Sequence, residues 1–149
     1  MLLRSPDGTA LELRIDGYHF PRVADDPWDS NALEVTVRVV SQAQSWSVTD
    51  PCLTTYEAED LARWLATVAA SRPPDRVVRI AGPNMGFRLV GASGDRVRLR
   101  AEFDFEERPP WADHGLSVEL ELTRAALGTA ARDLRADLER FPNRADPPE

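Results

Sequence analysis

The sequence contains no lysine, so all 18 of its basic side chains are arginines, a bias that points to GC-rich coding rather than to a structural demand. Cysteine occurs once, as Cys52, which excludes an internal disulfide and favours a reducing compartment. No apolar run approaches the roughly 20 residues that a membrane-spanning helix needs, and the N-terminus lacks the apolar stretch of a signal peptide. These absences predict a cytoplasmic protein without a membrane partner.

Catalytic motifs are also missing. The chain has no P-loop, no glycine-rich dinucleotide turn, no GxSxG and no CxxC. Cys52 precedes an expected helix N-terminus, which favours a thiolate, but no histidine is near it in sequence to act as its base. His19 and His114, the two histidines, could each join a nearby aspartate in a metal site, although neither has ligand-type spacing and a surface role is simpler. We therefore expect a non-enzymatic protein with no cofactor and no bound metal.

Length and charge narrow the class of partner. A chain of 149 residues suits one domain, and 42% hydrophobic with 29% charged residues is ordinary for a globular protein. The net charge of −7 opposes nonspecific binding to nucleic acid or to anionic lipid. A basic protein partner is favoured instead, because long-range attraction raises the rate of encounter.

Apolar and charged residues alternate in several segments, the clearest being 10–16, 33–39, 95–106 and 116–122. This period of two is typical of strands with one buried face. Because parallel sheets are buried on both faces, the pattern indicates antiparallel pairing with one wet side. We expect six to eight strands in a single antiparallel sheet, beginning with a hairpin whose tight turn contains Asp7 and Gly8.

Two amphipathic helices are expected at about 54–70 and 123–140. Thr54 and Glu57 form a capping box at the start of the first helix, and Thr123 caps the second. The helices would cover the dry face of the sheet, giving an α+β fold in one domain that spans residues 1–141. The remaining segment, 142–149, has the composition of a disordered tail.

The expected strand at 95–107 carries charges of both signs on its wet face. Arginines at 96, 98 and 100 precede the carboxylates of Glu102, Asp104 and Glu106. Acid–base catalysis needs two carboxylates in different environments, whereas a row on a wet sheet face is explained by cross-strand ion pairs. The same row of charged side chains could also serve as a binding surface for a partner.

The segment ADDPWDSN places a tryptophan among aspartates in a loop, and ERPPWADHG repeats the theme near the end of the chain. A loop tryptophan can cap the core, but exposed tryptophans are also common interface anchors, and carboxylates around them would steer a basic partner. The candidate partner-binding residues are Asp25, Asp26, Trp28, Asp29, Trp111 and Asp113.

Three stretches carry a family resemblance: residues 17–35, residues 46–65, and the late charged strand with the LELTRAAL that follows it. The first contains a WDxN motif (Trp28, Asp29 and Asn31), followed by Ala32 where the family usually has an aromatic residue. Together they resemble the WapI-type immunity proteins that accompany bacterial polymorphic toxins, over roughly residues 17–141.

The resemblance implies stoichiometric neutralisation of a cognate basic toxin domain of nuclease type. In that role the tryptophans would act as anchors and the aspartates as mimics of phosphate. Two alternatives stay open on the residues alone. One is a domain with a different protein partner or with self-assembly through a sheet edge. The other is a small-molecule binder or enzyme with a pocket lined by His19 or His114.

Overall fold

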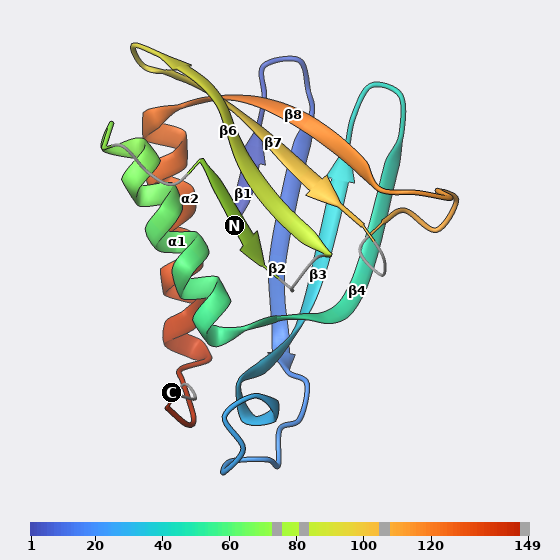
Figure 1. Cartoon of the computed structure of the whole chain (residues 1–149), viewed down its shortest axis with the longest axis vertical. Coiled ribbons are helices and arrows are strands. Elements are labelled where there is room, and N and C mark those ends of the chain that lie inside the picture. The colour runs from blue at the N-terminus through green and yellow to red at the C-terminus, as the bar shows by residue number, and fades with distance from the viewer. Residues whose placement is uncertain (73–75, 81–83, 105–107, 147–149) are drawn as a thin grey trace.

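The computed structural model describes residues 1–72, 76–80, 84–104 and 108–146, without the side chains of Cys52 and Ile80. Within these residues the structure describes eight strands, two α-helices and one 3₁₀ turn (η1), shown in Figure 1. Their order is β1 (Leu2–Arg4), β2 (Ala10–Tyr18), η1 (Asp29–Asn31), β3 (Ala32–Val40), β4 (Ser45–Thr54), α1 (Thr55–Ala69), β5 (Val77–Ile80), β6 (Met85–Ser93), β7 (Arg96–Phe103), β8 (Leu116–Thr123) and α2 (Arg124–Arg140).

The first four strands form an antiparallel sheet, here called the N-terminal sheet, in the order β1-β2-β3-β4. Its first hairpin closes as the sequence predicts, because Gly8 adopts φ of 91° and the Asp7 carboxylate accepts the Thr9 N–H at 2.9 Å. The register of β3 shifts against both neighbours near its start, so bulges bend the sheet beside the loop that joins β2 to β3.

The last four strands form a separate antiparallel sheet, the C-terminal sheet, in the order β5-β6-β7-β8. The long alternating segment is β7, which buries Val97, Leu99, Ala101 and Phe103 on one face. Its predicted extension lies partly outside the described residues, because 105–107 are among those left out.

The predicted single sheet of six to eight strands is therefore wrong, while the α+β class and the antiparallel pairing are confirmed. The apolar faces of the two sheets pack against each other, as the edge-on contact of Trp46 with Phe103 at 5.6 Å between ring centroids illustrates. At the β1–β8 junction the Ser5 hydroxyl donates to the Glu121 carbonyl (3.3 Å) and accepts the Glu121 N–H (2.6 Å). Packing sheet on sheet buries both dry faces, which two short helices could not have covered.

The two helices pack side by side and close one side of the sandwich (Figure 1). Thr54 and Glu57 form the predicted capping box of α1, and the Thr123 side chain accepts the Ala126 N–H at the start of α2. The helix α1 also contacts β4 and β5, and α2 contacts β1 and β8. Within the described part of the chain, no helix combines the length and apolar character that spanning a membrane requires.

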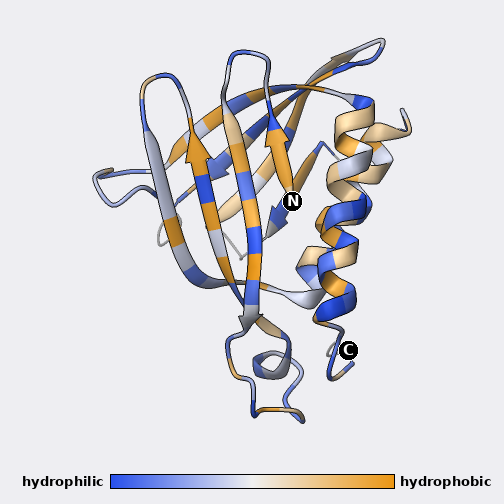
Figure 2. Ribbon diagram, turned by 180° about the vertical axis from the view of Figure 1, so that it is seen from behind, coloured by the Kyte–Doolittle hydropathy of each residue, from blue (hydrophilic) through white to orange (hydrophobic). Residues whose placement is uncertain are grey.

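Figure 2 shows the alternation of apolar and polar residues along the strands of the N-terminal sheet. The core combines the inner faces of both sheets with the apolar stripes of both helices. Its largest fully buried side chains include Phe87, Phe103, Leu13 and Leu99. The packed core leaves the loops at the ends and sides of the sandwich as the places where function is to be sought.

Candidate functional site

The acidic loop, defined as residues 19–31, joins β2 to β3 below the strands in Figure 1. One aspartate shapes it: the Asp26 carboxylate accepts the backbone N–H groups of Trp28 (2.8 Å) and Asp29 (2.7 Å). The Asp26 carbonyl accepts the N–H of Ser30 at 3.0 Å. Asp26 is thus engaged within the loop, as aspartates commonly are in turns.

Trp28 projects from this turn and is 58% exposed, so the alternative that it caps the core is wrong. Asp25 and Asp29 flank it and are both exposed. Among the described residues neither carboxylate has an ion-pair or hydrogen-bond partner. The loop therefore presents one large aromatic between two free negative charges, while its third aspartate stabilises the turn.

Asn31 anchors the loop to the rest of the protein. Its side chain is fully buried, at 0% exposure, and its amide nitrogen lies 2.9 Å from the Pro27 carbonyl and 2.6 Å from the Tyr56 hydroxyl. The amide oxygen accepts the Thr55 hydroxyl (3.1 Å) and the Arg144 N–H (2.9 Å). One side chain thus joins the acidic loop, the first turn of α1 and the C-terminal segment.

Burial raises the pKa of the Tyr56 hydroxyl, and the negative charges of Asp146 and Glu59 act in the same direction, against the opposing hydrogen bond from Asn31. The phenol therefore stays neutral at physiological pH and can donate its proton to the Ala145 carbonyl while accepting from Asn31. In the sequence Asn31 stands out only as part of the WDxN motif, which does not predict its structural role.

Trp111 lies in a second loop, described over residues 108–115, beside β4. It is 54% exposed, and its ring packs edge-on against the buried Trp46 at 6.3 Å, so it covers part of the core and still presents an exposed surface. Arg108 Nη1 donates to the Asp113 carbonyl at 2.9 Å, and the Asp113 side chain is exposed. Figure 1 shows this loop apart from the acidic loop, so the candidate residues fall into two groups that the fold does not bring together.

The two histidines lie in different loops, since His19 begins the acidic loop and His114 lies in the loop that contains Trp111. His19 Nδ1 lies 3.5 Å from Glu34 Oε2, and its ring packs edge-on against Phe20. His114 is exposed, and Cys52 lies near the end of β4, shortly before α1 begins, as the sequence predicts. Among the described residues, no group of three or more potential ligands is placed to hold a metal ion.

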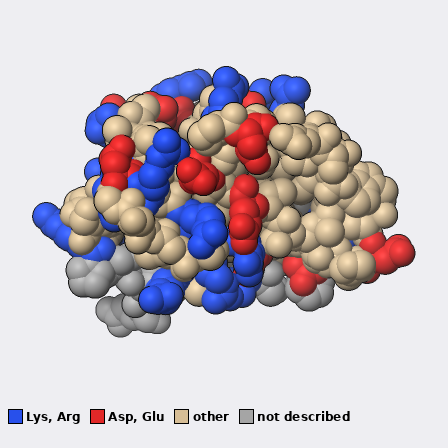
Figure 3. Space-filling view, turned by 90° about the horizontal axis from the view of Figure 1, so that it is seen from above, with Lys and Arg blue, Asp and Glu red and all other residues tan. Residues whose placement is uncertain are grey.

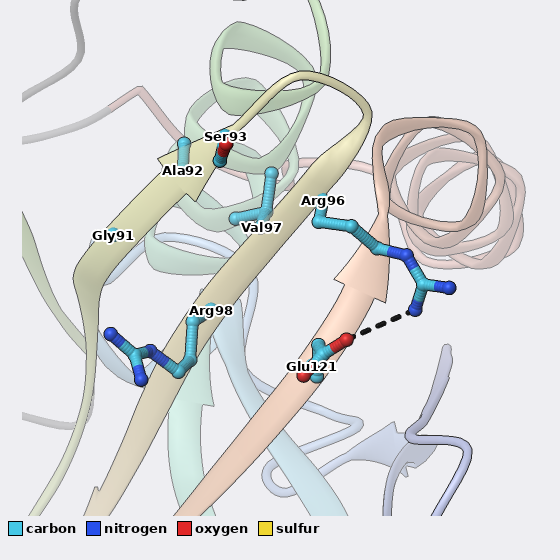
Figure 4. A pocket seen from close by; sticks show the side chains of 7 residues that line it. All are labelled: Gly91, Ala92, Ser93, Arg96, Val97, Arg98 and Glu121. Atoms are coloured by element: carbon cyan, nitrogen blue, oxygen red, sulfur yellow. Dashed lines mark hydrogen bonds and ion pairs between the residues drawn. The ribbon is translucent and has the colours of Figure 1, made fainter.

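The hollows on the described surface include four of about 320 to 420 Å³, and none of these four is lined by a histidine or by a candidate residue. Figure 4 shows one of about 340 Å³ on the C-terminal sheet, where Arg96 pairs with Glu121 and the Arg98 guanidinium points away from that carboxylate. All four are open depressions with charged residues in their lining, and they differ in this from the enclosed pockets that bind small molecules.

The outer face of the C-terminal sheet carries the ion-pair network that the sequence predicts. Figure 3 shows basic and acidic groups interspersed on the face seen from above, next to a broad uncharged area. Exposed pairs of this kind contribute little to stability individually. They join Arg96 to Glu121 (3.0 Å), Arg100 to Glu119 (2.8 Å), and both Arg79 and Arg88 to Glu102 (3.3 and 3.2 Å).

Comparison with known proteins agrees with the family resemblance. Searches of the curated proteins and of the solved structures find no match to this chain. The model of the Immunity protein WapI-like family, in contrast, matches residues 1–142, which include both sheets, both helices and the acidic loop. The chain therefore belongs to the WapI-like immunity protein family.

Proposed function

We propose that this protein is an immunity protein that neutralises a cognate toxin domain by binding it through the acidic loop, without catalysing a reaction. Membership of the family supports an immunity role. The observation that carries the choice of surface is Trp28, which is 58% exposed on a loop that hydrogen bonds of Asn31 and Asp26 stabilise. An ordered loop loses little conformational entropy on binding.

The charge of the loop favours a basic partner, and a toxin that cleaves nucleic acid is basic where it holds phosphate. Asp25 and Asp29 are free to pair with such groups, and Trp28 between them supplies apolar area. Aromatic anchors surrounded by charge are typical of interface hot spots. In this proposal the two aspartates take the place of substrate phosphates, and the toxin's active site is blocked.

Trp111 and Asp113 are proposed as a second contact. Trp111 is held against Trp46, so its ring presents a rigid surface. Because the two loops lie apart, only a partner large enough to reach both would use them together. We therefore assign the main contact to the acidic loop and the weaker one to Trp111.

The proposal is tested by capture of the partner from a lysate of the source cells, with mass spectrometry to identify it. The captured protein should be toxic when expressed alone in a test host, and co-expression of this chain should restore growth. Trp28→Ala should then weaken binding by about 30-fold or more, since hot-spot residues contribute about 2 kcal/mol or more. The double variant Asp25→Asn/Asp29→Asn should mainly lower the association rate, and this effect should shrink at high salt.

Matched controls separate local contacts from total charge. The double variant Asp95→Asn/Asp133→Asn also removes two exposed carboxylates, but from the β6–β7 turn and from α2. It should bind with nearly unchanged affinity. Asp26 is kept intact in all variants because its carboxylate orders the loop. Equal binding by wild type, Trp28→Ala and the acidic-loop double variant would refute the proposed surface, and a captured partner without toxicity would refute the immunity role.

A further inference from the structure

We propose that the C-terminal segment, residues 141–145, is a latch that holds the acidic loop in its binding conformation, with Arg144 as the positioning residue. This inference rests on the proposed function for its consequence in binding, but loop order can be tested without any partner. The matched family model ends at residue 142, so Arg144 lies just beyond it.

The guanidinium of Arg144 is placed to bind the backbone of the loop. Its Nη1 donates toward three carbonyl oxygens, those of Phe20 (3.4 Å), Pro21 (3.0 Å) and Val23 (3.2 Å). These residues form the first half of the acidic loop, before the turn that Asp26 shapes. Carbonyl groups that turn toward one another repel, and a cation between them favours this arrangement.

The same guanidinium stacks on an aromatic ring at the end of β2. Its central carbon lies 3.5 Å from the centroid of the Tyr18 ring, within the range of a cation–π contact. The Tyr18 hydroxyl donates to the carbonyl of Pro142, and the ring of Tyr18 packs edge-on against Phe141 at 5.7 Å. Tyr18 therefore fixes the start of the latch and the position of the Arg144 side chain.

The backbone of the latch binds the second half of the loop. The Arg144 N–H donates to Asn31 Oδ1 at 2.9 Å, and the Ala145 carbonyl accepts from the Tyr56 hydroxyl and lies 3.2 Å from Asn31 Nδ2. The latch thus contacts the loop on both sides of Trp28 but leaves that residue exposed. Loss of the latch should therefore release the loop without removing any part of the proposed binding surface.

Hydrogen exchange of Arg144→Ala tests this inference. The amides of Val23, Ser30 and Asn31 are hydrogen-bonded within the loop, and they should exchange about tenfold faster or more when the charged donor is lost. The amide of Leu99 in β7 should be unchanged, which excludes general destabilisation. Arg132→Ala is the matched control, because Arg132 is exposed on α2 and its guanidinium donates to the Thr129 hydroxyl of the same helix at 3.1 Å.

Chemical rescue provides a second readout. Guanidinium ion at low millimolar concentration should enter the space left in Arg144→Ala and restore slow exchange in the loop, whereas sodium ion at equal ionic strength should not. Arg144→Lys should give intermediate exchange rates, because an ammonium keeps the positive charge but lacks the planar arrangement of N–H donors that a guanidinium has.

The outcomes separate this inference from the proposed function. Unchanged loop exchange in Arg144→Ala would overturn the latch, whatever the partner does. Suppose that Arg144→Ala speeds exchange in the loop but leaves the affinity for the partner unchanged, while Trp28→Ala weakens binding of the same partner. That result would overturn the positioning role of Arg144. If Trp28→Ala leaves the affinity unchanged, the proposed function fails, while the exchange rates still decide whether the latch orders the loop.

Discussion

Replacement of the buried Asn31 by alanine should strongly destabilise the protein. The amide has two donor hydrogens and two acceptor positions, so it can make about four hydrogen bonds at once. Its oxygen accepts from the Thr55 hydroxyl and the Arg144 N–H. Four acceptors lie within reach of its nitrogen and share its two hydrogens: the Pro27 and Ala145 carbonyls and the Ser30 and Tyr56 hydroxyls. A neutral hydrogen bond contributes about 1 kcal/mol net, so the sum has an upper limit near 4 kcal/mol.

Hydrogen bonds to water replace part of the stabilisation that the substitution removes. Tyr56 and Arg144 are half-buried and can be solvated after the substitution, whereas Thr55 is 0% exposed and its hydroxyl loses its acceptor. We therefore expect Asn31→Ala to lower the free energy of unfolding by about 2–3 kcal/mol. Urea denaturation followed by circular dichroism measures this change, and thermal unfolding should show Tm lower by about 4–12 °C.

Two companion variants make the test specific. Asn31→Asp keeps the acceptor oxygen for Thr55 and Arg144 but removes both donors, so it separates the two halves of the network. Asn143→Ala removes an exposed amide from the neighbouring segment and should change stability by no more than about 0.5 kcal/mol. A loss below about 0.5 kcal/mol in Asn31→Ala would refute the assignment of Asn31 as the anchor of the loop.

Three further predictions concern the fold. Thr54→Ala breaks the capping box with Glu57 and should cost about 1 kcal/mol in denaturation; no measurable loss would contradict the cap. Desolvation raises the pKa of Asp16, but its hydrogen bonds with Thr36 and Arg14 and the charge of Arg14 outweigh this, so its pKa lies below that of a free aspartate. A carboxylate with a lowered pKa stabilises the fold above the unfolded-state pKa and loses that contribution as pH falls through the folded-state pKa. Asp16→Asn should therefore cost up to about 1 kcal/mol at pH 7 and less at pH 3, and an equal loss at both pH values would contradict the ion pair. Leu99→Ala in the core should cost about 2–5 kcal/mol, and a loss under about 1 kcal/mol would mean that the two sheets are not packed as described.

The boundaries of the helices could be predicted because local chemistry sets them. Thr54 and Thr123 each place a side-chain oxygen where the first helical N–H groups need an acceptor, and both helices begin at the next residue. The wet and dry faces of the strands could also be predicted, since alternation along a strand is a local pattern. Arg96 and Glu121, for example, meet on the wet face.

The partition of the strands into two sheets could not be predicted in this way. Alternation shows which face of a strand is buried, but it does not show what covers that face. A single sheet under two helices and two sheets packed together have the same pattern along each strand. Contacts such as Trp46 against Phe103 decide between them, and these join residues far apart in the chain.

The candidate site, like the fold, has features that the sequence predicts and features that only the structure shows. The sequence by itself determined an acidic, aromatic loop after β2, because composition and turn residues are local properties. Only the tertiary structure decided that Trp28 is exposed, that Asp26 is engaged by the backbone, and that Asn31 binds Arg144 across 113 residues of chain. Hydrogen bonds between distant segments depend on the path of the whole chain, and no local pattern specifies them.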